Sequence, residues 1–315
     1  MKEIGGYIDF ERYRLPMLYD EGIKLNSGRN CLAYIIKANN IKSICIPYYI
    51  CDCIIDTCRK YGVTIKYYHV GIDFKPVEIQ QCNDDWVYIV NYFGQISHEE
   101  MIQFSKRYNN IIVDNAQAYF NSPVKNTETI YTCRKFFGVP DGGVLFSNRK
   151  LKEKLVVDES FQHMVHLVGR FERTASEFYN EMKDNNQRFA NEDIKQMSKL
   201  TENLLHSIDY EDVRRRRDTN YLYLSSKLNN INLIKPKETA GPFAYPLMVT
   251  NAEKMRKELI NHNVYIPILW PNVKNETDAN RIEFKLANNI LPLPCDQRYE
   301  LCDMELVSQM VLSFF

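Results

Sequence analysis

One lysine in this sequence of 315 residues stands in a setting suited to covalent chemistry. Lys135 follows Arg134 and precedes Phe136 and Phe137. Removal of water by aromatic neighbours and repulsion from a nearby cation both favour the uncharged amine, which can attack a carbonyl carbon and form a Schiff base. Because most lysines of a protein are solvated, this setting acquires meaning only beside other groups.

A carboxylate closes one of the apolar runs of the chain. Asp114 ends the run IIVD at residues 111–114. An aspartate at the end of a buried strand can point into a crevice, where it needs a cationic or protonated partner. The simpler interpretation is an aspartate that caps a following helix.

Two glycine-containing turns complete the candidate chemistry. Residues 26–30 (NSGRN) precede a predicted helix, whose first N–H groups can hold a phosphate, although Ser-Gly also caps ordinary helices. Residues 140–143 (PDGG) indicate a tight turn before a strand that begins at Val144.

Together these four segments fit a site for pyridoxal 5′-phosphate. That cofactor needs a lysine for covalent attachment, a carboxylate beside its pyridine nitrogen and a cup for its phosphate. Each segment lies at the carboxyl end of a predicted strand or at the start of a predicted helix, where parallel α/β sheets form their sites.

The elements that must position these residues alternate between helix and strand from residue 26 to 157. Ser97, followed by Glu100, has the pattern of a capping box. Short apolar strands between helices predict an α/β fold whose mostly parallel sheet is covered on both faces. The expected helices are 30–38, 51–61 and 98–108, and the expected strands are 41–47, 63–68, 86–92, 111–113, 129–132 and 144–147.

The rest of the chain predicts a helical stretch and a smaller α+β domain. Residues 158–228 are charged and poor in glycine and proline, which favours helix. The four arginines at 214–217 are typical of a solvated helix face, with contact to an anion as the alternative. We expect a cofactor-binding domain at 1–228 and a second domain at 229–315. Its elements are strands at 243–250 and 264–269 and helices at 252–262 and 304–314.

Composition excludes several classes of function. Lys+Arg and Asp+Glu both total 40, so the net charge is +0, and the electrostatic case for binding nucleic acid or an anionic membrane is removed. No apolar run is long enough for a membrane span, and the N-terminus shows no apolar core of a secretory signal. We therefore expect a cytoplasmic protein.

The nine cysteines follow no disulfide spacing. Cys51, Cys53 and Cys58 form the closest group, but the second pair of ligands that a structural zinc site needs is missing. We expect no metal, and we interpret the cysteines as small buried side chains of a reducing compartment.

With these motifs in order, the sequence resembles the DegT/DnrJ/StrS family of pyridoxal-phosphate-dependent aminotransferases, many of which act on nucleotide-linked sugars. The similarity extends over most of the chain. The matching stretches are residues 25–30, 113–118, 134–143 and 293–299.

The resemblance implies a fold-type-I structure and a role for each matched residue. Lys135 would form the internal aldimine and move the substrate proton. Asp114 would pair with the pyridinium nitrogen, and Gln117 would contact the phenolic oxygen of the ring. The phosphate would be held by Gly28, Arg29 and Thr132.

The resemblance also implies a homodimer. The partner subunit would complete the phosphate site, with Asn220 or an arginine from 214–217 as the candidate. Tyr49, from the pair Tyr48 and Tyr49, would stack on the cofactor ring.

The activity implied is transfer of an amino group from glutamate or glutamine to a keto-sugar nucleotide, in surface-polysaccharide or amino-sugar biosynthesis. One alternative is a pyridoxal-phosphate enzyme of another type, such as a dehydratase or lyase. Family members that dehydrate sugars tend to carry histidine in place of the lysine, so Lys135 argues against that variant. The other alternative is a binding protein that keeps the fold without catalysis.

Overall fold

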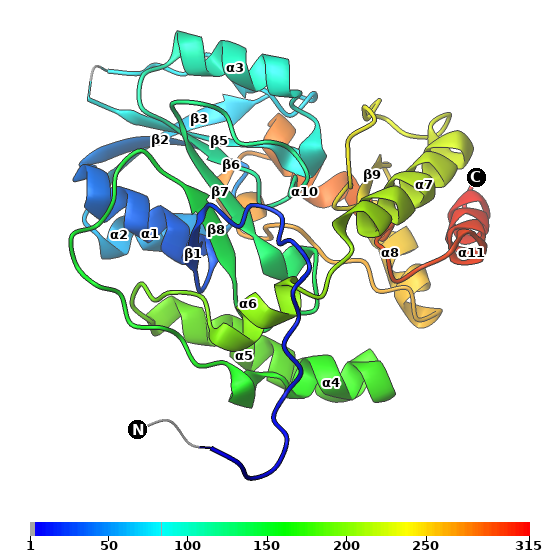
Figure 1. Ribbon diagram of the computed structural model, residues 1–315. Coiled ribbons are helices and arrows are strands. Elements are labelled where there is room, and N and C mark those ends of the chain that lie inside the picture. Colours follow the sequence, from blue (N-terminus) through cyan, green and yellow to red (C-terminus); the bar gives the residue numbers. More distant parts are fainter. Residues whose placement is uncertain (1–3, 83) are drawn as a thin grey trace.

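An eight-stranded sheet organises the larger part of the chain in the computed structural model, which describes residues 4–82 and 84–315 (Figure 1). Residues 1–3, the start of the segment searched for a secretory signal, lie outside the described residues. The strand order is β1-β8-β7-β6-β5-β2-β3-β4. The strands are β1 (Ile23–Leu25), β2 (Ser43–Pro47), β3 (Thr64–Val70), β4 (Pro76–Val77), β5 (Trp86–Val90), β6 (Ile111–Asp114), β7 (Glu128–Thr132) and β8 (Gly143–Phe146).

The centre of this sheet is parallel, as the sequence predicted. Strands β3, β2, β5, β6 and β7 run in one direction, whereas β1 and β7 pair antiparallel with β8, and β4 pairs antiparallel with β3. The carboxyl ends of the five parallel strands therefore meet at one edge. The predicted α/β class is confirmed.

The three helices predicted in this part are present as α1 (Gly28–Asn39), α2 (Asp52–Lys60) and α3 (His98–Arg107). The predicted capping box of α3 is confirmed, because Ser97 accepts from the backbone N–H of Glu100 and Glu100 accepts from that of Ser97. Two short 3-10 turns, Tyr92–Gly94 and Cys133–Lys135, follow β5 and β7.

The helical stretch expected over 158–228 is present as several separate helices, because capping residues restart the helix several times. Ser198 and Asp209 accept hydrogen bonds from the first turns of two new helices, and Thr174 forms a capping box with Glu177. The segment contains 3-10 turns at Phe161–His163 and Ala175–Phe178, and the helices α4 (Val165–Glu172), α5 (Tyr179–Asn191), α6 (Lys199–Leu205) and α7 (Tyr210–Leu228).

A second core lies beside the large sheet, where Figure 1 shows α7, α8 and α11 grouped together. β9 (Tyr245–Met248) pairs antiparallel with β10 (Ile290–Leu293), a strand that we did not predict. The helices here are α8 (Ala252–Asn261), α9 (Val273–Glu276), α10 (Ile282–Asn289) and α11 (Leu301–Leu312).

Two predictions concern this region, a strand at 264–269 and a domain boundary at 228. The strand expected at 264–269 is wrong: the segment is irregular, because Pro267 has no N–H to pair and restricts the backbone of Ile266. The domain boundary at 228 stays a prediction, and α7 contributes Tyr221, Leu224 and Leu228 to the second core. Across the described residues, no helix has both the length and the apolar composition that crossing a bilayer requires.

Candidate functional site

The predicted catalytic residues lie at the edge where the parallel strands end. Asp114 is the last residue of β6 and pairs with Ile130 of β7, whose own last residue is Thr132. Lys135 ends the 3-10 turn that follows Thr132. The carboxylate and the lysine therefore come from the ends of two neighbouring strands.

Asp114 is a buried carboxylate that forms no ion pair with the part of the chain that the structure describes. It is only 8% exposed, and it accepts hydrogen bonds from the Tyr88 hydroxyl and from the backbone N–H of Ala116, both at 2.8 Å. The ion pairs formed by residues 4–82 and 84–315 all involve other carboxylates. A buried carboxylate in this state calls for a cation to neutralise it.

Tyr88 is a site residue that the sequence did not reveal. Burial, with the negative charge of Asp114 as a further cause, raises the pKa of Tyr88 well above its ordinary value. The phenol therefore stays protonated and donates a hydrogen bond to the Asp114 carboxylate. The two residues are 26 positions apart. Because Tyr88 lies inside a uniformly apolar strand, nothing in the local pattern distinguished it from a core tyrosine.

Gln117 leaves one donor unused in a buried position. Its Oε1 accepts from the backbone N–H of Phe93 at 2.9 Å, whereas its Nε2 is buried and has no partner among the described residues. Phe93 holds a left-handed backbone, with φ of 52°. A buried amide donor without a partner indicates a missing acceptor at this place.

The start of α1 forms a small cup with the end of β7. Ser27 caps the helix by accepting from the N–H of Asn30 at 3.1 Å, and the first turn has no acidic residue. A Cβ placed on Gly28 would meet the Cβ of Thr132 at 3.4 Å, so these two residues face each other. Arg29 is half-buried beside them. The helix start therefore offers N–H groups, a hydroxyl and a guanidinium to an anion.

Residues 140–143 hold this cup in place. A Cβ on Gly143 would lie 2.7 Å from the backbone carbonyl carbon of Ser27, so only glycine lets β8 pass this close. Gly142, with φ of 120°, donates to the carbonyl oxygen of Asn26 at 2.8 Å. Asp141 is fully buried and accepts from both the N–H and the hydroxyl of Ser198, at 2.8 Å and 2.7 Å. The turn thus ties the cup to α6.

A cavity of about 1000 Å³ opens beside Lys135. It lies between α4 and α5 on one side and the loops at 262–265 and 294–299 on the other. Lys135 is exposed, and its Nζ is 5.8 Å from the centre of the Phe243 ring. Asp114, Gln117 and Thr132 are not among the residues that line this cavity. Lys135 therefore borders this cavity, whereas Asp114, Gln117 and Thr132, which we call the strand-end cluster, do not.

Tyr49 lies in the core. Its ring is fully buried, edge-on to Trp270 at 4.5 Å and 5.2 Å from Tyr92, and its hydroxyl has no partner among the described residues. Tyr48 stacks on Tyr67 and His69, each at 4.8 Å. The stacking role of Tyr49 stays a prediction that this packing does not support.

The candidates from α7 are engaged within their own chain. The amide of Asn220 donates to the carbonyl oxygens of Asp296 and Tyr299, at 3.3 Å and 2.9 Å. Its role toward a partner subunit stays a prediction. Of the four consecutive arginines, 214–216 are exposed and Arg217 is buried. The solvated face predicted for the run is therefore confirmed for three of the four.

Arg217, one of the four arginines named as candidates for the phosphate site, bonds to residues of its own chain, and its role toward a partner subunit stays a prediction. Its guanidinium donates to the carbonyl oxygens of Phe136 and Pro242, at 3.1 Å and 2.8 Å, and to Gln297 Oε1 at 2.7 Å. Gln297 in turn donates to the same Phe136 oxygen at 2.8 Å. Because Phe136 directly follows Lys135, this network fixes the backbone that carries the lysine.

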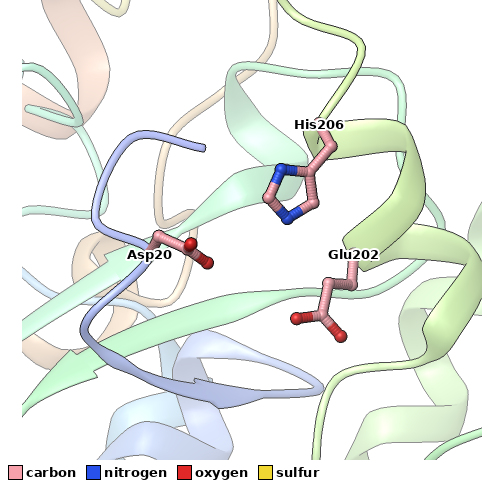
Figure 2. Close-up of side chains that lie close together, drawn as sticks. All are labelled: Asp20, Glu202 and His206. Carbon is pink, nitrogen blue, oxygen red and sulfur yellow. The ribbon is translucent and has the colours of Figure 1, made fainter. Parts of the chain in front are cut away.

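A further group of possible metal ligands lies between the N-terminal segment and α6 (Figure 2). Asp20, Glu202 and His206 point toward one another, with ligand atoms within 4.8 Å. The ammonium of Lys24 already lies 2.5 Å from Asp20 and 2.6 Å from Glu202. We interpret the group as an ion-pair cluster that attaches the N-terminal segment to α6.

The fold is shared with solved aminotransferases. A DegT/DnrJ/EryC1/StrS aminotransferase from Brucella abortus aligns with a TM-score of 0.61 and 13% identity, covering 93% of this chain and 85% of that one. NtdA from Bacillus subtilis, solved with bound cofactor PMP, gives 0.65 and 13%, covering 92% and 72%. Helicobacter pylori PseC, an aminotransferase involved in the biosynthesis of pseudoaminic acid, gives 0.62 and 13%, covering 93% and 86%.

At these low identities the structural alignments establish the fold alone. The fold-type-I architecture implied by the resemblance is confirmed. No protein-family model matches the sequence, and no curated protein matches it.

Proposed function

We propose that this protein is a pyridoxal-phosphate-dependent aminotransferase. The observation that carries the proposal is the buried Asp114 carboxylate, which has two hydrogen-bond donors and no cationic partner among the described residues. A protonated pyridine nitrogen is the kind of cation that such a carboxylate neutralises. The structural relative NtdA was solved with the amino form of this cofactor.

The neighbouring residues fit the same cofactor. The unpartnered Nε2 of Gln117 is a donor for the phenolic oxygen of the ring. The N-terminus of α1, with Gly28, Arg29 and Thr132, fits the phosphate. Lys135 supplies the amine for covalent attachment.

In this proposal Asp114 stabilises charge and Lys135 transfers a proton. When bound, the cofactor supplies an electron sink for the electron pair left on the substrate carbon after that carbon loses its proton. Asp114 holds the proton on the ring nitrogen. Lys135 Nζ takes the proton from the substrate carbon and returns it, and Arg217 keeps the lysine backbone in position through Phe136.

The cavity beside Lys135 supports an anionic amino acceptor. Its lining includes Arg134 and Arg170, while the lining residue Asp296 is neutralised by Arg298 at 2.6 Å. A diphosphate placed there would meet an excess of positive charge. We infer that the acceptor is a keto-sugar nucleotide and the donor glutamate or glutamine, as in amino-sugar or surface-polysaccharide biosynthesis.

Cofactor titration tests the cofactor part of this proposal. Purified protein should bind pyridoxal phosphate with the visible absorption of a lysine-bound cofactor, and borohydride should attach the cofactor permanently. Lys135→Ala should lose both properties, whereas Lys125→Ala, which changes an exposed lysine, should keep them. Equal trapping in the Lys135→Ala variant would refute the assignment.

Addition of glutamate tests the reaction type. Conversion of the bound cofactor to its pyridoxamine form is the result expected of an aminotransferase. Persistence of the pyridoxal form would instead favour a dehydratase or lyase. A panel of keto-sugar nucleotides and small keto acids, offered with glutamate, then identifies the acceptor by the amino product formed.

We further propose a cytoplasmic homodimer. Large apolar side chains are exposed on the N-terminal segment and on α4, including Tyr7 at 95% and Phe171 at 92%. The N-terminal segment is attached to the region of α6 by two hydrogen bonds (Figure 1). The backbone N–H of Leu15 donates to the carbonyl oxygen of His206, and the backbone N–H of Tyr13 donates to Oδ1 of Asn203. A second copy that covers these side chains would remove them from water. Light scattering on the purified protein measures the mass directly.

A further inference from the structure

Two cysteines touch each other at the start of α2. Cys51 is the residue before the helix, with an extended backbone, and Cys53 is its second residue. Their sulfur atoms are 2.6 Å apart. A disulfide bond is about 2.05 Å long, so the two sulfurs are in direct contact, at a distance close to that of a bond.

The pair is more accessible than most cysteines of the chain. Cys51 and Cys53 are partly exposed as residues. Cys82 and Cys302 are exposed but lie elsewhere in the sequence. The remaining cysteines are buried: Cys31, Cys45, Cys58, Cys133 and Cys295.

The charges around the pair distinguish its two members. The hydrogen bond that Cys53 shares with Cys51 lowers the pKa of Cys53, and burial opposes this effect. The positive charges of Arg29 and Lys135 lower the pKa further, whereas the negative charge of Asp114 raises it. The hydrogen bond to Cys53 and burial raise the pKa of Cys51. The positive end of α2 adds to the stabilisation of a thiolate at this place. These directions favour Cys53 as the thiolate of the pair, an assignment that the serine variants below test.

We propose that Cys51 and Cys53 form a redox-active dithiol, which a hydroperoxide oxidises to an intramolecular disulfide at the edge of the strand-end cluster. The proposal rests on the contact between the two sulfurs at the start of α2 and on the incomplete burial of both residues. It concerns a reaction of the protein itself and requires no bound cofactor. In a reducing compartment the dithiol is the resting state, and the disulfide is transient.

The chemistry takes two steps. The Cys53 thiolate attacks the outer oxygen of the hydroperoxide, the O–O bond breaks, and the alcohol leaves after taking a proton, which produces a sulfenic acid. The Cys51 sulfur then attacks the Cys53 sulfur, an S–S bond forms, and the hydroxyl leaves as water with the Cys51 proton. Two thiols are oxidised, and one hydroperoxide is reduced to an alcohol and water.

Mass spectrometry on the full-length protein tests the proposal with hydrogen peroxide as the probe. After oxidation and alkylation of the remaining thiols, trypsin releases residues 43–59, and fragmentation locates the modified positions. We expect loss of two hydrogen atoms confined to Cys51 and Cys53, reversed by dithiothreitol. Their oxidation should be about tenfold faster than that of the exposed Cys302.

Two isosteric variants separate the roles of the thiols. Cys51→Ser should accumulate a sulfenic acid at Cys53, trapped by dimedone, and Cys53→Ser should leave Cys51 about tenfold less reactive. Cys58→Ser, in the same helix, is the matched control and should oxidise like the wild type. The proposal is overturned if Cys51 and Cys53 form no bond with each other, if they react no faster than Cys302, or if the two serine variants react equally.

Discussion

The hydroxyl of Tyr88 donates a hydrogen bond of 2.8 Å to Oδ2 of Asp114, across two neighbouring strands of the sheet. The other oxygen of this carboxylate accepts from the N–H of Ala116. Both groups hold the carboxylate in one orientation at the end of β6. The orientation of the proposed partner of the cofactor nitrogen thus depends on a residue from the strand next to it.

Tyr88→Phe should weaken cofactor binding without unfolding the protein. A hydrogen bond to a charged group contributes about 1.5–3 kcal/mol, so we expect an affinity for pyridoxal phosphate lower by at least about tenfold. An absorbance titration measures this. Tyr245→Phe, which removes a buried hydroxyl in the second core, should leave the affinity unchanged. An unchanged affinity in Tyr88→Phe would show that Ala116 alone orients Asp114.

Asp114→Asn should separate activity from stability. The asparagine oxygen can accept from Ala116, and its amide can donate to the Tyr88 oxygen, so the free energy of unfolding without cofactor should change by less than about 1 kcal/mol. Loss of the charge should lower kcat for transamination on the order of 100-fold or more. Urea unfolding and a coupled glutamate assay give the two values. A fall of more than about 3 kcal/mol in stability would assign the carboxylate to folding instead.

Gly143→Ala should destabilise the cup at the start of α1. The added Cβ would lie 2.7 Å from the carbonyl carbon of Ser27, which is backbone and cannot move aside cheaply. We expect a loss of about 1–3 kcal/mol in the free energy of unfolding. Gly138→Ala, in the same motif, meets nothing within 4 Å and is the matched control. Equal urea midpoints for the two variants would contradict this account.

Arg217→Lys should disturb the lysine turn although it keeps the charge. A single ammonium cannot replace the three hydrogen bonds of the buried guanidinium, so we expect a loss of about 2–4 kcal/mol and lower kcat. Arg216→Lys changes an exposed neighbour and should stay within about 0.5 kcal/mol of wild type. Thermal unfolding of both variants decides between a structural Arg217 and a dispensable one.

The contribution of Glu100 to the free energy of unfolding should be lost at acid pH. Burial opposes its ionisation, but hydrogen bonds from Lys75, the Ser97 backbone and Lys237 outweigh burial and lower the pKa of Glu100 to about 2. Because the folded pKa lies below the unfolded value, this stability is complete above about pH 5 and disappears as the pH falls from about 4.5 to 2.

Glu100→Gln keeps the capping box and removes the charge, so it isolates this contribution. The variant should be less stable than wild type by about 1–2 kcal/mol at pH 7, and the difference should shrink toward zero near pH 2. Urea unfolding at a series of pH values measures it. A difference that is independent of pH would assign the effect to packing.

The sequence by itself determined the local elements and the identity of the main candidates. Apolar runs, caps and turn residues are local signals, so the strands β2 to β8 apart from the short β4, the helices α1 to α3 and the strand-end positions of Asp114 and Lys135 could be predicted. The helical stretch expected over 158–228 is divided for a local reason as well, because polar caps start new helices inside a sequence whose overall composition favours helix.

Only the tertiary structure decided which side chains meet. Tyr88 reaches Asp114, Arg217 turns inward while Arg216 faces water, and β10 pairs with β9. Each of these facts depends on contacts between residues far apart in the chain, or on which side of an element faces the core. A periodic pattern of apolar residues predicts that one face of a helix or strand is buried, but it does not indicate which residues pack against that face. For that reason the cofactor candidates could be named from the sequence, whereas the residues that hold them in place could not.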